Sequence, residues 1–87
     1  MIIRQVKIMN DAGLHARPAA IFVNLASKFQ SSIFVEKEDN RFNGKSLISV
    51  LSSQIIKGEI ITLIIEGEDE EKAEKALTFL VKANFNE

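Results

Sequence analysis

The chain passes from loop to helix within residues 13–19, Gly-Leu-His-Ala-Arg-Pro-Ala, and this stretch holds the only histidine of the 87-residue sequence. Gly13 permits a sharp bend of the backbone. Pro18 suits the first turn of a helix, because its missing N–H group would have no partner there in any case. Apolar side chains then recur at helical spacing as far as Phe29. The pattern predicts an amphipathic helix over residues 16–29 with His15 at its N-terminus.

Sequence patterns around this helix predict four strands and two further helices. Strands are expected at residues 2–8, 33–37, 41–43 and 59–66. Ser46 is a favourable cap for a short helix over residues 47–53 whose buried face is Leu47, Val50 and Leu51, and Asp69 is a favourable cap for a final helix. The order β-α-β-β-α-β-α predicts a single α+β domain over residues 1–87, with strands and helices in two layers. It fits a ferredoxin-like split βαβ arrangement with an extra helix, and equally other two-layer open sandwiches.

Alternation in the last strand assigns apolar side chains to both faces of the sheet. Those expected to face the helices are Ile61, Leu63 and Ile65. Those expected on the opposite face are Ile60 and Ile64, with Ile3 and Phe34 as neighbours. The sequence therefore predicts an apolar patch on an open sheet face. We expect a monomer; the patch would serve self-association or an unidentified partner, and a tolerated apolar surface explains it as well.

The composition is that of a soluble globular domain, with 46% hydrophobic and 26% charged residues. The absence of cysteine and the single histidine exclude a disulfide framework and make a structural zinc site improbable, and no cofactor motif is present. A net charge of −1 gives no general attraction to nucleic acid. No apolar stretch is long enough to span a bilayer and no signal-peptide pattern occurs, so we expect a cytoplasmic protein without membrane insertion.

The charges are unevenly distributed along the chain. Residues 1–58 carry 8 basic and 4 acidic groups, a net charge of +4, whereas residues 59–87 carry 3 basic and 8 acidic groups, a net charge of −5. His15 lies in the cationic part. This distribution suits docking onto acidic protein surfaces or handling of phosphate.

His15 combines a nucleophile with an anion-binding environment. The first N–H groups of a helix have no partner within the helix and attract anions. Neutral imidazole is a nucleophile that can accept a phosphoryl group. The new negative oxygens could then be stabilised by the guanidinium of Arg17 and by first-turn amides, including that of Ala16. The alternative for an isolated histidine is a surface residue or a helix cap.

Residues 13–19 resemble the motif of the HPr family, the histidine-containing phosphocarriers of the bacterial phosphoenolpyruvate-dependent sugar phosphotransferase system. The resemblance extends to the segment Lys45-Ser46-Leu47-Ile48, to Lys57-Gly58-Glu59 and to the length and order of elements. It implies an open-faced sandwich, in which three helices cover one face of a four-stranded antiparallel sheet.

The resemblance also implies a function. Enzyme I would pass a phosphoryl group from phosphoenolpyruvate to the Nδ1 atom of His15, and sugar-specific enzyme IIA would receive it. Arg17 would steady the phosphate charge. The protein would be a carrier and not an enzyme with turnover of its own.

Ser46 matches the regulatory serine of this family. The resemblance implies phosphorylation by HPr kinase/phosphorylase, slower transfer from enzyme I and binding to catabolite control protein A; without the resemblance, Ser46 reads as a helix cap. Two other functions fit the sequence. One is a carrier of the nitrogen-regulatory phosphotransfer branch, and the other is a regulatory module that binds partners through Leu47, Ile48 and Leu51 without chemistry at His15.

Overall fold

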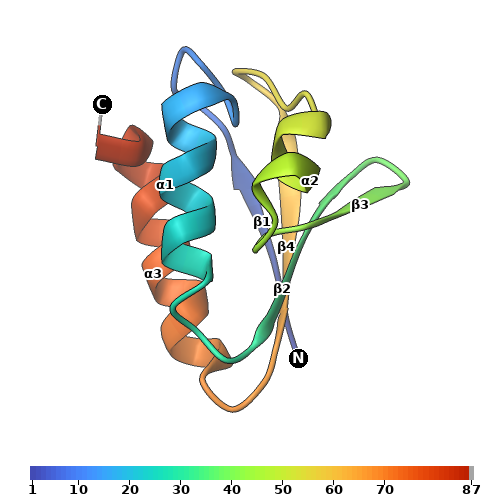
Figure 1. The fold of residues 1–87 in the computed structure, drawn as a ribbon, viewed down its shortest axis with the longest axis vertical. Helices are drawn as coiled ribbons and strands as arrows, with labels where there is room; N and C mark the ends of the chain where they lie inside the picture. The colour runs from blue at the N-terminus through green and yellow to red at the C-terminus, as the bar shows by residue number, and fades with distance from the viewer. Residues whose placement is uncertain (87) are drawn as a thin grey trace.

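A four-stranded antiparallel sheet with helices on one face forms the fold (Figure 1). The computed structural model describes residues 1–86. Its elements are β1 (Ile2–Lys7), α1 (Ala16–Ala26), β2 (Ser32–Lys37), β3 (Asn40–Asn43), α2 (Leu47–Ser52), β4 (Ile60–Glu66), α3 (Glu70–Lys82) and a 3₁₀ turn, η1 (Asn84–Asn86). The strand order is β1-β4-β2-β3. This order decides between the arrangements that the pattern left open and confirms the open-faced sandwich.

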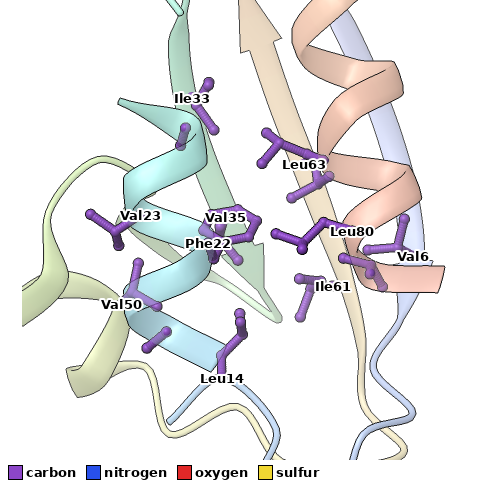
Figure 2. Packing of buried hydrophobic residues seen from close by; sticks show 14 of the residues in the cluster. Val6, Leu14, Phe22, Val23, Ile33, Val35, Val50, Ile61, Leu63 and Leu80 are labelled. Atoms are coloured by element: carbon purple, nitrogen blue, oxygen red, sulfur yellow. The ribbon is translucent and has the colours of Figure 1, made fainter. Parts of the chain in front are cut away.

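The central strand β4 holds the two layers together. Its inward side chains, Ile61, Leu63 and Ile65, are fully buried, as alternation predicted. In Figure 2, Phe22 of α1 and Leu80 of α3 reach into the space beside Ile61 and Leu63 of β4, and all four belong to one core cluster with Ile65. Burial of each such side chain contributes about 1.5–3 kcal/mol to folding. The core therefore fixes both long helices against the sheet.

The opposite face of the sheet carries the apolar patch that the sequence predicted. Ile64 pairs with Ile3 of β1 on one side and with Phe34 of β2 on the other, so the three form a row across the sheet. Ile3 is 66% exposed and Ile60 is 59% exposed. The guanidinium of Arg41 lies over the Phe34 ring, 5.6 Å from its centroid. The patch is confirmed, and self-association through it stays a prediction.

Helix α1 is shorter than the periodicity predicted, because its last turn tightens. It ends at Ala26, and the expected end at Phe29 is wrong. The amide of Lys28 bonds to the Leu25 carbonyl at 3.1 Å, and that of Phe29 bonds to the Ala26 carbonyl at 3.2 Å. These i to i−3 bonds replace the α-helical ones. Phe29 still packs against the core.

Asp69 occupies the N-cap position of α3, but its carboxylate makes no capping bond, so this expectation is wrong. The carboxylate instead accepts hydrogen bonds from the backbone amides of Gln30, at 2.9 Å, and Ser31, at 3.0 Å, and from the Ser31 hydroxyl. It thereby ties the α1–β2 turn to the β4–α3 turn. The Ser31 hydroxyl bond, followed by the Gln30 amide bond, lowers the pKa of Asp69 to about 2.

Within residues 1–86, no helix has both the length and the apolar character needed to cross a membrane.

The Asp69 contacts predict acid-dependent stability. Because the pKa falls from 3.8 to about 2 on folding, the contribution is complete above pH 3.8 and disappears as the pH approaches 2. Urea unfolding should show that the free energy of unfolding drops less between pH 4 and pH 2 in Asp69→Asn than in the native chain. Asp39→Asn, in the exposed turn after β2, is the control and should keep the native acid dependence. Equal pH profiles for Asp69→Asn and the native chain would contradict the assignment.

Candidate functional site

Leu14 anchors the loop that carries His15. Its side chain is 1% exposed and belongs to the core. Its amide donates to the carbonyl of Ile55 at 3.0 Å. Two kinds of interaction thus fix the residue immediately before His15, one to the core and one to the segment between α2 and β4.

The loop before Leu14 is closed by Asn10 and Gly13. The Asn10 Nδ2 atom donates to the Gly13 carbonyl at 2.9 Å, and the Gly13 amide donates to the Asn10 carbonyl at 3.2 Å. Gly13 has φ +63°, and a Cβ atom there would lie 2.3 Å from the Ile55 carbonyl oxygen. Only glycine allows this approach, which accounts for the residue at the start of the motif. The Asn10 Oδ1 atom is buried without a hydrogen-bond partner.

Ala16, the first residue of α1, has a left-handed backbone conformation with φ +51°. This conformation costs an alanine roughly 1–2 kcal/mol. His15, at the N-cap, is extended with φ −134° and ψ 160°. The chain therefore turns sharply between His15 and Arg17, and no sequence pattern indicated this.

The side chains of His15 and Arg17 are free. Both residues are exposed, and the His15 imidazole makes no capping bond to the helix. In the described part of the chain, the Arg17 guanidinium has neither an ion pair nor a hydrogen bond. Pro18 has no N–H, so Ala16 and Arg17 supply the amide donors of the first three helical positions. The structure thus places the predicted nucleophile, guanidinium and amides within one turn.

Ser46 caps α2, as predicted. Its Oγ atom accepts from the Ser49 amide at 3.2 Å. In Figure 1, α2 runs so that its last turn approaches the N-terminal end of α1 and its first turn lies away from it. Ser46, the N-cap of α2, therefore lies at the end of α2 that is farther from the start of α1.

Exposed apolar side chains occur both on α2 and beside the His15 loop, which is more widely than expected. Ile48 is 81% exposed and Leu51 is half-buried, and their contact with partners stays a prediction. Leu47 is 41% exposed, so its assignment to the buried face of α2 is wrong, whereas its place on the surface is right. Sequence reasoning missed Met9 and Ile56, which are exposed beside the His15 loop. Alternation could have found them, because each follows a buried isoleucine and must point outward.

In the described part of the chain, no three metal-ligating side chains come together.

Comparison with known proteins agrees with this geometry. The family model described as "PTS HPr component phosphorylation site" matches residues 2–83. The HPr-like protein Crh of Halalkalibacterium halodurans is 44% identical over 82 residues, 94% of this chain and 98% of that protein. Phosphocarrier protein HPr of Neisseria meningitidis serogroup A is 40% identical over 87 residues, 100% of this chain and 98% of that protein. The crystal structure of HPr-C-His from Thermoanaerobacter tengcongensis superposes with a TM-score of 0.98 at 46% identity, covering 100% of this chain and 98% of that one.

The fold and these matches define a phosphocarrier, not a catalytic enzyme. The chain belongs to the HPr family of the phosphotransferase system.

The conformation of Ala16 predicts opposite effects for two Ala→Gly substitutions in α1. Ala16→Gly removes the left-handed strain and should raise the free energy of unfolding by about 0.5 kcal/mol. Ala20→Gly, in ordinary helix, should lower it by about 1 kcal/mol. Denaturant titrations of both variants measure the difference. If Ala16→Gly destabilises as much as Ala20→Gly, the assigned strain is absent.

Proposed function

We propose that His15 accepts a phosphoryl group from phosphorylated enzyme I and passes it to sugar-specific enzyme IIA. The observation that carries this proposal is an exposed imidazole without a capping bond, at a helix N-terminus beside a free guanidinium. A structural histidine at this position would be expected to use its ring in a cap or a buried bond. His15 does neither, so the ring is available to a partner.

The transfer needs no cofactor. A ring nitrogen of His15, taken as Nδ1 from the family resemblance, donates its lone pair to phosphorus and forms a P–N bond. The bond between phosphorus and the donor group of enzyme I breaks, and that group keeps the electron pair. Transfer to enzyme IIA repeats the exchange and returns His15 to its starting form. The protein therefore contributes positioning and charge stabilisation and has no turnover of its own.

Arg17 and the Ala16 amide are the groups proposed to stabilise the charge. A guanidinium offers planar donors that match phosphate oxygens, and amides at a helix start favour an anion. Arg17 makes no ion pair within residues 1–86, so no carboxylate of the described chain competes with a phosphoryl group for its guanidinium. Its exposure also lets it contact the partner's side of the transfer site.

Ser46 is proposed as a regulatory site for HPr kinase/phosphorylase. Ser46 is partly exposed at the start of α2, where a phosphate is electrostatically acceptable. Inhibition would then arise from repulsion between this phosphate and an acidic surface of enzyme I, and not from unfolding. Binding of the phosphorylated form to catabolite control protein A belongs to the same proposal.

Leu47, Ile48 and Leu51 are proposed to contact these partners, because the first two expose apolar area next to the helix that carries His15. Cytoplasmic location follows from the same set of partners. A regulatory module that binds through this surface without phosphorylation is the second candidate. A nitrogen-regulatory carrier is a third, and the cap-forming Ser46 segment argues mildly against it.

His15 and Arg17 give the first test. Enzyme I and phosphoenolpyruvate should produce an acid-labile, hydroxylamine-sensitive adduct that is lost in His15→Ala. Arg17→Gln should slow its formation about tenfold or more, because a charge-assisted contact to phosphate is lost. Lys72→Gln, the same charge change on α3, should leave the rate unchanged. If the native chain forms no adduct, the carrier function fails and the binding module gains support.

Ser46 gives an independent test. ATP and the bifunctional kinase should add an acid-stable phosphate that is absent in Ser46→Ala. Ser46→Asp keeps a capping oxygen, so it should preserve stability while slowing phosphorylation by enzyme I; Ser46→Ala should lose about 1 kcal/mol of stability through the missing cap. Absence of the acid-stable phosphate would leave Ser46 with its cap role alone.

A further inference from the structure

An ion pair joins the last residue of β2, Lys37, to Glu59, the residue immediately before β4. The Nζ atom of Lys37 is 3.0 Å from the Oε2 atom of Glu59, and the two side chains are 19% and 29% exposed. Alternation along β2 puts Lys37 on the helix side, in line with the buried Ile33 and Val35. The pair is therefore less accessible to water and ions than an ordinary surface pair.

Both partners also hold the backbone between α2 and β4. The Lys37 Nζ atom donates to the Gln54 carbonyl at 3.3 Å. The Glu59 Oε1 atom accepts from the Ile56 amide at 2.7 Å. These hydrogen bonds hold in place the residues on both sides of Ile55. The Ile56 amide bond, followed by the Lys37 contact, lowers the pKa of Glu59, so the carboxylate is charged near neutral pH.

The backbone of this segment, residues 54–56, is strained at Gln54. Gln54 follows the end of α2 and is left-handed, with φ +53°. This conformation costs a glutamine roughly 1–2 kcal/mol, and surrounding contacts must maintain it. The Lys37 bond is made to the carbonyl of this same residue. Without the ion pair, fewer contacts would maintain the backbone conformation of residues 54–56.

Ile55 connects residues 54–56 to the proposed phosphorylation site through a hydrogen bond. Its carbonyl accepts from the Leu14 amide at 3.0 Å, and Gly13 packs directly against it. Leu14 immediately precedes His15. A shift of the Ile55 carbonyl therefore moves the base of the loop that presents the imidazole.

We propose that Lys37 and Glu59 are positioning residues for phosphoryl transfer: their ion pair fixes residues 54–56, and through the Ile55 carbonyl it fixes the loop that presents His15. This inference rests on the proposed carrier function. It goes beyond it by assigning a role to two side chains that do not touch the phosphoryl group. Since transfer depends on alignment of the reacting atoms, loss of the pair should reduce the maximal rate more than it weakens docking.

The chain offers a matched control on the same strand. Glu36 of β2 pairs with Arg41 of β3 at 3.3 Å, with side-chain exposures of 35% and 55%, and neither partner bonds to residues 54–56. Glu36→Gln thus removes the same charge from an ion pair one residue away. It should leave both the rate and the loop unchanged.

Steady-state phosphorylation by enzyme I, at varied concentrations of this protein, separates the maximal rate from KM. Lys37→Met and Glu59→Gln should each lower the maximal rate about tenfold with KM within twofold. Lys37→Arg keeps the cation and should stay within twofold of the native rate. Hydrogen exchange of the Leu14 amide, measured without enzyme I, should be faster in Lys37→Met and Glu59→Gln and unchanged in Glu36→Gln.

The two readouts separate the two claims. Unchanged Leu14 exchange overturns the positioning role whatever the kinetics. Faster exchange with native maximal rates overturns it also, since the pair would then be merely structural, and a rise in KM alone assigns it to docking. If the native chain is not phosphorylated at all, the proposed function fails, and that result is recognisable without any variant.

Discussion

The hydrogen bond from the Leu14 amide to the Ile55 carbonyl, together with burial of the Leu14 side chain, is the constraint on which the site depends. It joins two loops that are 41 residues apart in sequence. Gly13 must lack a side chain for the loops to approach this closely. The junction fixes the base of the loop that carries His15 against the segment between α2 and β4.

Around that junction, a backbone held by hydrogen bonds carries exposed side chains. Strained residues lie on both sides of it, Ala16 at the start of α1 and Gln54 after α2, and each persists because neighbouring contacts hold it. His15 and Arg17 have few contacts of their own. This arrangement suits a phosphocarrier, because the group that accepts the phosphoryl must be well positioned and still be accessible.

The sequence predicted those parts of the structure that arise from local periodicity. Alternation identified Ile61, Leu63 and Ile65 as core residues, and a serine before an apolar run identified the cap of α2. Prediction failed where distant partners compete with local ones. Aspartate is a favourable cap residue, but the Asp69 carboxylate accepts hydrogen bonds from Ser31 instead of capping α3. The contact of Lys37 with Glu59 joins residues 22 positions apart, and the left-handed turn at Ala16 has no compositional signal because alanine usually favours a helix.

The row formed by Ile3, Ile64 and Phe34 lies on the face of the sheet that the helices leave uncovered. The proposed acceptor His15 lies at the N-terminus of α1 and not on this face. For this reason the uncovered face is a suitable place to attach a reporter group or a tether that leaves His15 exposed.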